Sequence, residues 1–77
     1  KRLAITHKNI PNMVGQITNA IAEAGVNIVD MLNKSRDEVA YTLIDLESEI
    51  SDMAIDNLKQ IDGILTLRVL NQPAIEV

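Results

Sequence analysis

The stretch LAITHKNIPNMVGQITNAIAEAGVNI, residues 3–28, decides how this chain folds. It begins with alternating apolar and polar side chains, a pattern typical of a half-buried strand. A polar loop with Pro11 follows, and proline is favoured in the first turn of a helix. From Met13 onward apolar residues recur in steps of three and four until Ala24 and Gly25, which form a typical helix end. The stretch therefore predicts a strand, an amphipathic helix and a second strand.

The rest of the chain alternates between strand and helix in a similar way. A short polar break at 35–38 separates two segments with strand-like patterns, which predicts a hairpin. Ser51 is placed to cap a second helix, and Asp62-Gly63 is placed to end it. In order, the sequence predicts strands over 2–7, 26–34, 39–47 and 64–70, with helices beginning at Met13 and after Ser51.

The predicted order β-α-β-β-α-β is that of an α+β domain with the ferredoxin-like arrangement. Right-handed crossovers would place both helices on one face of a four-stranded antiparallel sheet. We expect this domain to occupy residues 1–70. We expect the tail, residues 71–77 with Pro73, to be frayed because it has no evident partner.

The composition excludes several classes of function. The net charge is −4 and the basic residues are scattered, which disfavours binding to the phosphates of nucleic acids. The chain has no cysteine, and Tyr41 is its one aromatic residue, so thiolate metal sites and stacking platforms for bases are not expected. Its apolar runs are too short to span a membrane, and it lacks the common catalytic and nucleotide-binding motifs. We therefore predict no catalytic residue, metal or cofactor in this segment.

The first residues and the size of the chain indicate a domain of a longer protein that pairs with a second copy. It begins with Lys1-Arg2 rather than Met and has no signal peptide, so we expect a cytoplasmic domain cut from a longer protein. A core built from Ile, Leu, Val, Met and Ala in 77 residues is marginal on its own. Pairing with a second copy is a common remedy, and we therefore expect a homodimer.

Polar residues on either side of the first helix form the candidate site. His7 and Asn9 lie in the loop before the helix, and Asn27 lies just after it. An asparagine amide offers both a donor and an acceptor, and a charged histidine can donate from either ring nitrogen. A strand–helix–strand unit folds back on itself, so we expect these three residues to meet near a sheet edge. A carboxylate would also find unpaired backbone N–H groups at the helix start, around Asn12, Met13 and Val14.

Each of these residues has a simpler explanation when taken alone. A histidine at the exposed end of a strand needs no ligand to account for it. Asn9 and Asn12 are residue types that favour turns, and Asn27 is placed to complete the exit from the helix. Only the three residues together indicate a binding site.

The pattern H-x-N-x-P at 7–11, with a helix ending in A-G-V-N-I at 24–28, resembles the ACT domains that sense amino acids. In particular, it resembles the C-terminal regulatory domain of D-3-phosphoglycerate dehydrogenase, and the resemblance covers residues 2–70. It implies that two domains pair edge to edge and bind L-serine between them for feedback control of serine biosynthesis. It also implies that His7 and Asn9 of one chain, and Asn27 of the other, contact the ligand. The implied parent is an NAD-dependent oxidoreductase.

One position departs from the family pattern, which usually has glycine after the loop proline where this chain has Asn12. Asparagine is the residue other than glycine that best tolerates positive φ, so the turn is expected to form. A side chain at this position narrows the expected pocket.

The sequence supports two hypotheses about function, which belong to different functional classes. The first is a dimeric regulatory module that binds an amino acid, with L-serine as the expected ligand. The second is an assembly module without a ligand, which Asn12 favours. The ACT domain of another enzyme of amino-acid metabolism, such as serine dehydratase, is an alternative parent, whereas a stand-alone enzyme is disfavoured by the missing motifs.

Overall fold

The computed structural model describes residues 1–70, and the predicted tail lies outside these residues. The order of the elements is the predicted one, so the ferredoxin-like α+β fold is confirmed. The elements are β1 (Arg2–Lys8), α1 (Met13–Glu23), β2 (Ile28–Arg36), β3 (Val39–Leu46), α2 (Asp52–Lys59) and β4 (Ile64–Leu70).

The hairpin is the one place where the predicted bounds differ clearly. The second strand starts at Ile28 and continues through Arg36, so the polar break is a tight turn at Asp37 and Glu38 rather than four residues. Asp37 makes this turn with φ of 56°, a left-handed conformation that aspartate adopts more readily than most residues. Ser35 and Arg36 are polar and still belong to the strand, because this end of β2 is exposed on both faces.

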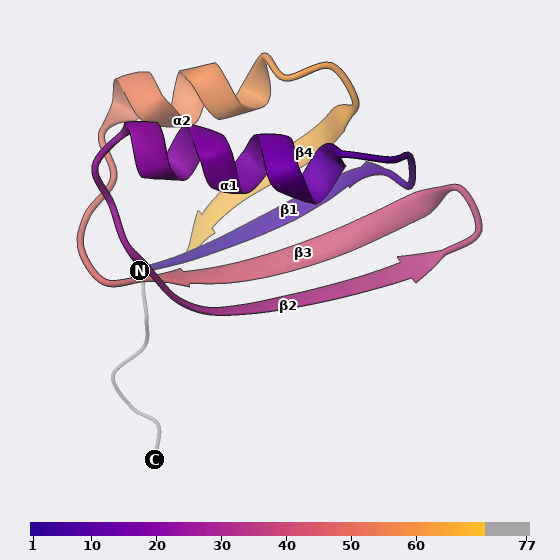
Figure 1. The fold of residues 1–77 in the computed structure, drawn as a ribbon, viewed down its shortest axis with the longest axis horizontal. Helices are drawn as coiled ribbons and strands as arrows, with labels where there is room; N and C mark the ends of the chain where they lie inside the picture. Colours follow the sequence, from indigo (N-terminus) through magenta and orange to yellow (C-terminus); the bar gives the residue numbers. More distant parts are fainter. Residues whose placement is uncertain (71–77) are drawn as a thin grey trace.

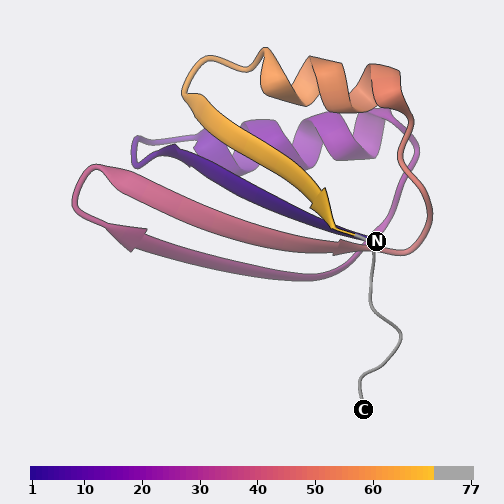
Figure 2. The same ribbon diagram turned by 180° about the vertical axis from the view of Figure 1, so that it is seen from behind.

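The four strands form one antiparallel sheet in the order β2-β3-β1-β4. Both helices cover the same face, as predicted, and the other face is open (Figures 1 and 2). The β2–β3 hairpin extends beyond the ends of the helices, and β2 forms one free edge of the sheet (Figure 1). Every residue of β2 after Ile28 is exposed, on both faces of the strand.

The core lies between the helices and the three strands β1, β3 and β4. Alternation along β1 sends Leu3 and Ile5 toward the helices, and the helical period of α1 brings Ile17 and Ile21 onto them. Ile44 of β3 and Leu58 of α2 complete the fully buried centre.

Helix α2 begins as the sequence predicts, at a serine cap. The backbone N–H of Ala54 donates to the Ser51 hydroxyl oxygen at 3.1 Å, and Asp52 lies in the first turn near the positive end of the helix dipole.

Removing this cap tests how much it contributes to stability. We expect Ser51→Ala to lower the free energy of unfolding by about 1 kcal/mol, because the Ala54 N–H loses its partner. Urea denaturation followed by circular dichroism measures the change. Ser48→Ala is the matched control, since Ser48 is exposed just before the helix. Equal effects of the two substitutions would show that the cap contributes nothing.

An ion pair joins β1 to β3 on the open face of the sheet. The Arg2 guanidinium donates to both carboxylate oxygens of Asp45, at 2.6 and 3.1 Å. This hydrogen bonding lowers the pKa of the Asp45 carboxyl below its usual range, against a smaller opposing effect of partial burial.

The lowered pKa of Asp45 predicts how stability depends on pH. The extra stability is present above the pKa of an unfolded aspartate, about 3.9, and is lost as pH falls through the lower folded value. We therefore expect Asp45→Asn to destabilise the domain at about pH 7, with the difference from wild type shrinking in strong acid. Urea denaturation at several pH values measures it, with the exposed Asp56→Asn as control. A difference that stays constant with pH would contradict the assignment.

Candidate functional site

Asn9, in the loop between β1 and α1, is hydrogen-bonded to the β2–β3 turn. The Asn9 side-chain Nδ2 donates to the Asp37 carbonyl at 2.9 Å, and the Asn9 backbone N–H donates to the Glu38 carbonyl at 2.9 Å. Both nitrogens of Asn9 therefore donate to the turn. The side-chain oxygen of Asn9 is left as an acceptor on an exposed residue.

Helix α1 starts from a left-handed residue, which confirms that asparagine can replace glycine in this turn. Asn12 has φ of 72°, and the first helical hydrogen bond runs from Gln16 N to Asn12 O at 3.1 Å. The N–H groups of Met13 and Val14 precede this bond and have no acceptor within the helix.

The Asn12 side chain lies along the first turn of α1 without capping it. Its Oδ1 is 2.8 Å from the place that a Cβ on Gly15 would occupy. Gly15 therefore leaves the space in which the Asn12 amide lies, beside the first turn of α1.

His7 is buried rather than exposed at the end of its strand, with 2% of its surface accessible. Its Nδ1 lies 3.0 Å from the Lys8 carbonyl oxygen, and its Nε2 lies 2.8 Å from the Thr42 hydroxyl. The simpler explanation offered by the sequence, a solvent-exposed histidine, is therefore wrong. Both ring nitrogens already have partners within the domain.

Asn27 lies at the opposite end of the sheet from His7 and Asn9. The Asn27 carbonyl accepts from the N–H of Glu47, which directly follows β3, whereas His7 stands opposite Ala40 near the start of β3. Seven residues of an extended strand separate these positions, which is about 23 Å. The expectation that the three residues meet within one chain is therefore wrong, because α1 carries the chain back along the whole sheet before β2 begins.

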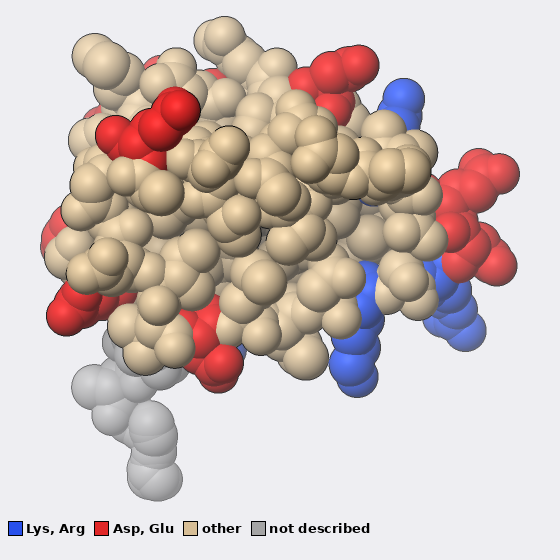
Figure 3. Space-filling view, in the orientation of Figure 1, with Lys and Arg blue, Asp and Glu red and all other residues tan. Residues whose placement is uncertain are grey.

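The two ends of the sheet offer different chemistry. The Asn27 amide donates to the Glu47 carboxylate at 2.9 Å, so this end presents a carboxylate and an amide oxygen, both acceptors. The other end presents the free backbone N–H groups at the start of α1. On the face shown in Figure 3, acidic side chains are spread around the rim and basic ones lie mainly toward the hairpin.

Two polar residues that the sequence analysis did not select belong to the surroundings of His7. Thr42 is fully buried and is shared by His7 and by Asn33, whose Nδ2 donates to the Thr42 hydroxyl oxygen at 2.6 Å. The available signal was the inward position of Thr42 in the strand segment VAYTLIDL, where its neighbours on that face are Ala40 and Ile44.

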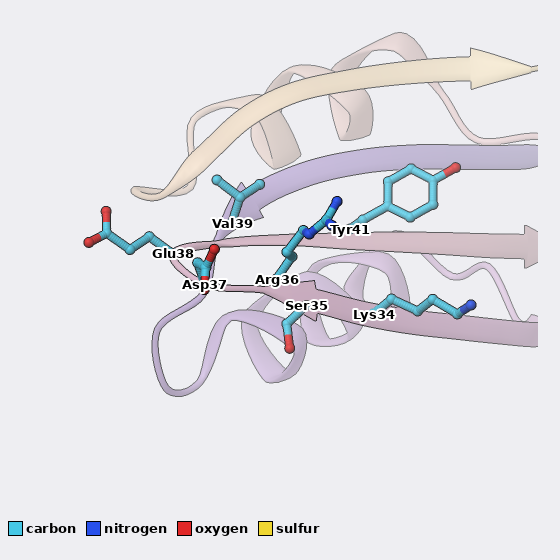
Figure 4. Close-up of a pocket in the computed structure, with 7 residues that line it drawn as sticks. All are labelled: Lys34, Ser35, Arg36, Asp37, Glu38, Val39 and Tyr41. Carbon is cyan, nitrogen blue, oxygen red and sulfur yellow. The ribbon is translucent and has the colours of Figure 1, made fainter.

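A broad hollow lies on the open face of the hairpin (Figure 4). It measures about 1100 Å³, is wide open, and contains none of the predicted site residues. Its lining combines both signs of charge, from Lys34 and Arg36 to Asp37 and Glu38 (Figure 4). A smaller hollow of about 500 Å³ includes Asn9.

Neither a metal site nor a membrane span is found within residues 1–70. No three His, Asp or Glu side chains in that range are grouped to hold a metal ion. Neither of its two helices has the length and apolar character needed to cross a bilayer.

Known proteins resemble this chain in sequence and, separately, in fold. No family model matches the chain. It is 30% identical over 70 residues to D-3-phosphoglycerate dehydrogenase of Haemophilus influenzae and 29% identical over 72 residues to that of Escherichia coli. These matches cover 91% of this chain but only 17% and 18% of the two relatives, so the chain spans less than a fifth of their length.

Solved structures share the whole fold at low sequence identity. The ACT domain from GTP pyrophosphokinase of Chlorobium tepidum has a TM-score of 0.73 at 20% identity and covers 87% of this chain and 91% of that one. An ACT domain protein from Streptococcus pneumoniae has a TM-score of 0.68 at 20% identity, covering 87% and 84%. The regulatory subunit of aspartate kinase from Thermus thermophilus has a TM-score of 0.68 at 14% identity, covering 88% of this chain and 49% of that one. The chain thus has the fold of an ACT domain, and its sequence is similar to a segment of D-3-phosphoglycerate dehydrogenases.

Proposed function

We propose that this chain is a regulatory amino-acid-binding domain in which two copies bind L-serine between them. The parent would be a cytoplasmic, NAD-dependent enzyme resembling D-3-phosphoglycerate dehydrogenase, and the domain itself would carry out no chemistry. The ligand site would comprise His7 and Asn9 with the first turn of α1 from one chain, and Asn27 from the other. The observation that carries the proposal is the separation of these residues within one chain.

Symmetric pairing of edge strands removes that separation. When two copies of β2 pair antiparallel about a two-fold axis, the start of one strand lies beside the end of the other. Asn27 of each copy would then lie at the hairpin end of its partner, which is the end that carries His7 and Asn9. A site that is incomplete in one chain becomes complete in the pair.

The edge strand β2 is suited to such pairing. It is the longest strand of the sheet at nine residues, and no helix lies over it (Figure 1). Its apolar side chains Val29, Met31 and Leu32 are 66, 40 and 47% exposed. An exposed edge strand with apolar side chains in its first half readily pairs with another strand, so a second copy would cover this surface.

The chemistry of the two contributing ends fits the two charged groups of a free amino acid. Backbone N–H groups at the start of α1 suit a carboxylate. The Asn27 amide oxygen and the Glu47 carboxylate of the second copy suit an ammonium group. A small polar side chain such as that of serine would then lie between Asn9 and the helix.

Regulation would follow from linkage between ligand binding and domain pairing. A ligand that contacts both copies binds the paired arrangement better than the separated one, and it therefore favours pairing. In a longer protein, the position of catalytic domains attached to the two copies would change with serine concentration.

A subunit-mixing experiment tests whether the site is shared. We expect Asn9→Ala and Asn27→Ala chains each to lose saturable L-serine binding in calorimetry. Mixing them after reversible unfolding should restore binding to about one quarter of the sites, because each mixed pair contains one intact site and one doubly altered site. A mixture of Asn9→Ala with itself is the control. Binding retained by either variant alone, or no recovery on mixing, would contradict a shared site.

A second candidate function is an assembly module without a ligand, and the Asn12 side chain favours it. The Asn12 amide lies along the first turn of α1, where a family glycine would leave the backbone open.

Replacing Asn12 separates the two functions. If the chain is a sensor, Asn12→Gly is expected to strengthen L-serine binding severalfold, because the first-turn N–H groups become more accessible while glycine retains positive φ. Asn12→Asp is the control that keeps the bulk of the side chain. If the wild-type chain and Asn12→Gly both form pairs and neither binds serine, the assembly function is the correct one.

A further inference from the structure

Three polar side chains form a continuous hydrogen-bonded row across the helix-facing side of the sheet. His7 of β1 meets Thr42 of β3 at 2.8 Å, and Thr42 meets Asn33 of β2 at 2.6 Å. Thr42 and Asn33 are direct partners in the strand register. We refer to these three residues as the His7 relay.

The directions of the hydrogen bonds in the relay follow from the groups at its two ends. The Lys8 carbonyl can only accept, so the His7 Nδ1 facing it carries a proton. The Asn33 Nδ2 donates to the Thr42 hydroxyl oxygen, so the Thr42 hydroxyl proton is left to donate to the lone pair of the His7 Nε2. With its Nδ2 directed inward, Asn33 has its Oδ1 directed outward.

The relay matters for binding because His7 lies far from the free edge. Two strand spacings, about 10 Å, separate β1 from the edge strand β2, and only 2% of the His7 surface is accessible. Asn33 is exposed on β2 itself, beside the surface where the second copy would pair. The outward Oδ1 of Asn33 is therefore the acceptor that the relay presents at this surface.

We infer that Thr42 and Asn33 extend the ligand site: Thr42 positions His7, and the Asn33 Oδ1 accepts a hydrogen bond from the ammonium group of the amino-acid ligand. This inference rests on the proposed function for the identity of the ligand. His7 acts through the relay, because it holds the Asn33 amide in the orientation that presents an acceptor. A chain of hydrogen bonds pointing in one direction also polarises its members cooperatively, which strengthens the terminal acceptor.

The relay itself is tested without any ligand, by nitrogen–proton NMR of the His7 ring in the 77-residue chain. We expect one protonated nitrogen, Nδ1, in the wild-type domain. Asn33→Asp replaces the inward donor with an acceptor of the same shape, so Thr42 must donate to it and accept from His7. The His7 Nε2, which accepts in the wild type, is then expected to be the donor toward Thr42 and to show a proton in the spectrum. An Nε2–H ring in the wild type, or an unchanged ring in Asn33→Asp, would overturn the relay.

The ligand contact is tested by calorimetry with L-serine. We expect Asn33→Leu to weaken binding about tenfold or more, the usual effect of losing a hydrogen bond to a charged group. Thr42→Val is expected to weaken binding as well, because the Asn33 amide loses the hydroxyl that orients it. Thr42→Ser, which restores the hydroxyl, is expected to retain both the affinity and the Nδ1–H ring. Asn57→Leu on the exposed side of α2 is the control for a surface asparagine.

The NMR experiment and the calorimetry test different statements, so a negative result in one leaves the other informative. If the wild-type chain does not bind L-serine, the proposed function and the ligand contact are both wrong, while the NMR result still decides whether the relay fixes His7. If serine binds the wild type and Asn33→Leu equally, the proposed function stands and the contact of Asn33 with the ligand is overturned.

Discussion

Replacing Ile17 with alanine is expected to lower the free energy of unfolding by about 2–5 kcal/mol. Ile17 is fully buried in the core cluster formed by α1 with β1 and β3, and deleting three of its carbon atoms leaves a cavity. A chain of this size has a total stability of roughly 4–12 kcal/mol, so much of that stability would be lost. Urea denaturation followed by circular dichroism measures the change.

Ile10→Ala removes the same atoms from an exposed position and serves as the control. Half of the Ile10 surface is accessible, so we expect a loss of about 0.5 kcal/mol or less. A similar loss for both variants would show that the core is not centred on Ile17.

The second large effect is expected at the sheet edge. Introducing lysine at both Val29 and Met31 of β2 should convert paired chains to monomers, because charged side chains on an edge strand oppose pairing. Serine binding should be lost with the pair, since neither chain contains a complete site. Sedimentation velocity and calorimetry on the same sample measure the two losses.

The opposite edge provides the control for this experiment. Leu65→Lys with Val69→Lys places the same charges on β4, where the apolar side chains are 49 and 46% exposed. We expect these chains to remain paired and to bind serine. Dissociation caused by the β4 substitutions instead would assign the interface to the other edge.

The fold could be predicted from local patterns, because each element is amphipathic with its own period. Alternation in β1 and the three- and four-residue steps in α1 both follow from burial on one face. The caps carry equally local signals, and both the Ser51 cap and the left-handed turn at Asn12 are confirmed. The end of β2 was harder to predict, since a strand exposed on both faces has no alternation to follow.

The geometry of the site depended on topology, which local patterns do not determine. His7 and Asn27 flank the same helix in the sequence, but β1 and β2 run in the same direction with β3 between them, so the two residues lie at opposite ends. The relay was missed for a related reason. Thr42 and Asn33 become partners of His7 only once the register of three strands is known.

A calorimetric titration of the chain with L-serine, beside glycine, L-alanine and D-serine, decides whether the domain is a serine sensor. We expect saturable binding of L-serine with about one site per chain, weaker binding of the other three, and a sedimentation coefficient that rises with serine. Preferential binding of glycine or alanine would retain the sensor but change its ligand. An L-serine titration with no heat beyond dilution, from chains that are already paired, would contradict the claim.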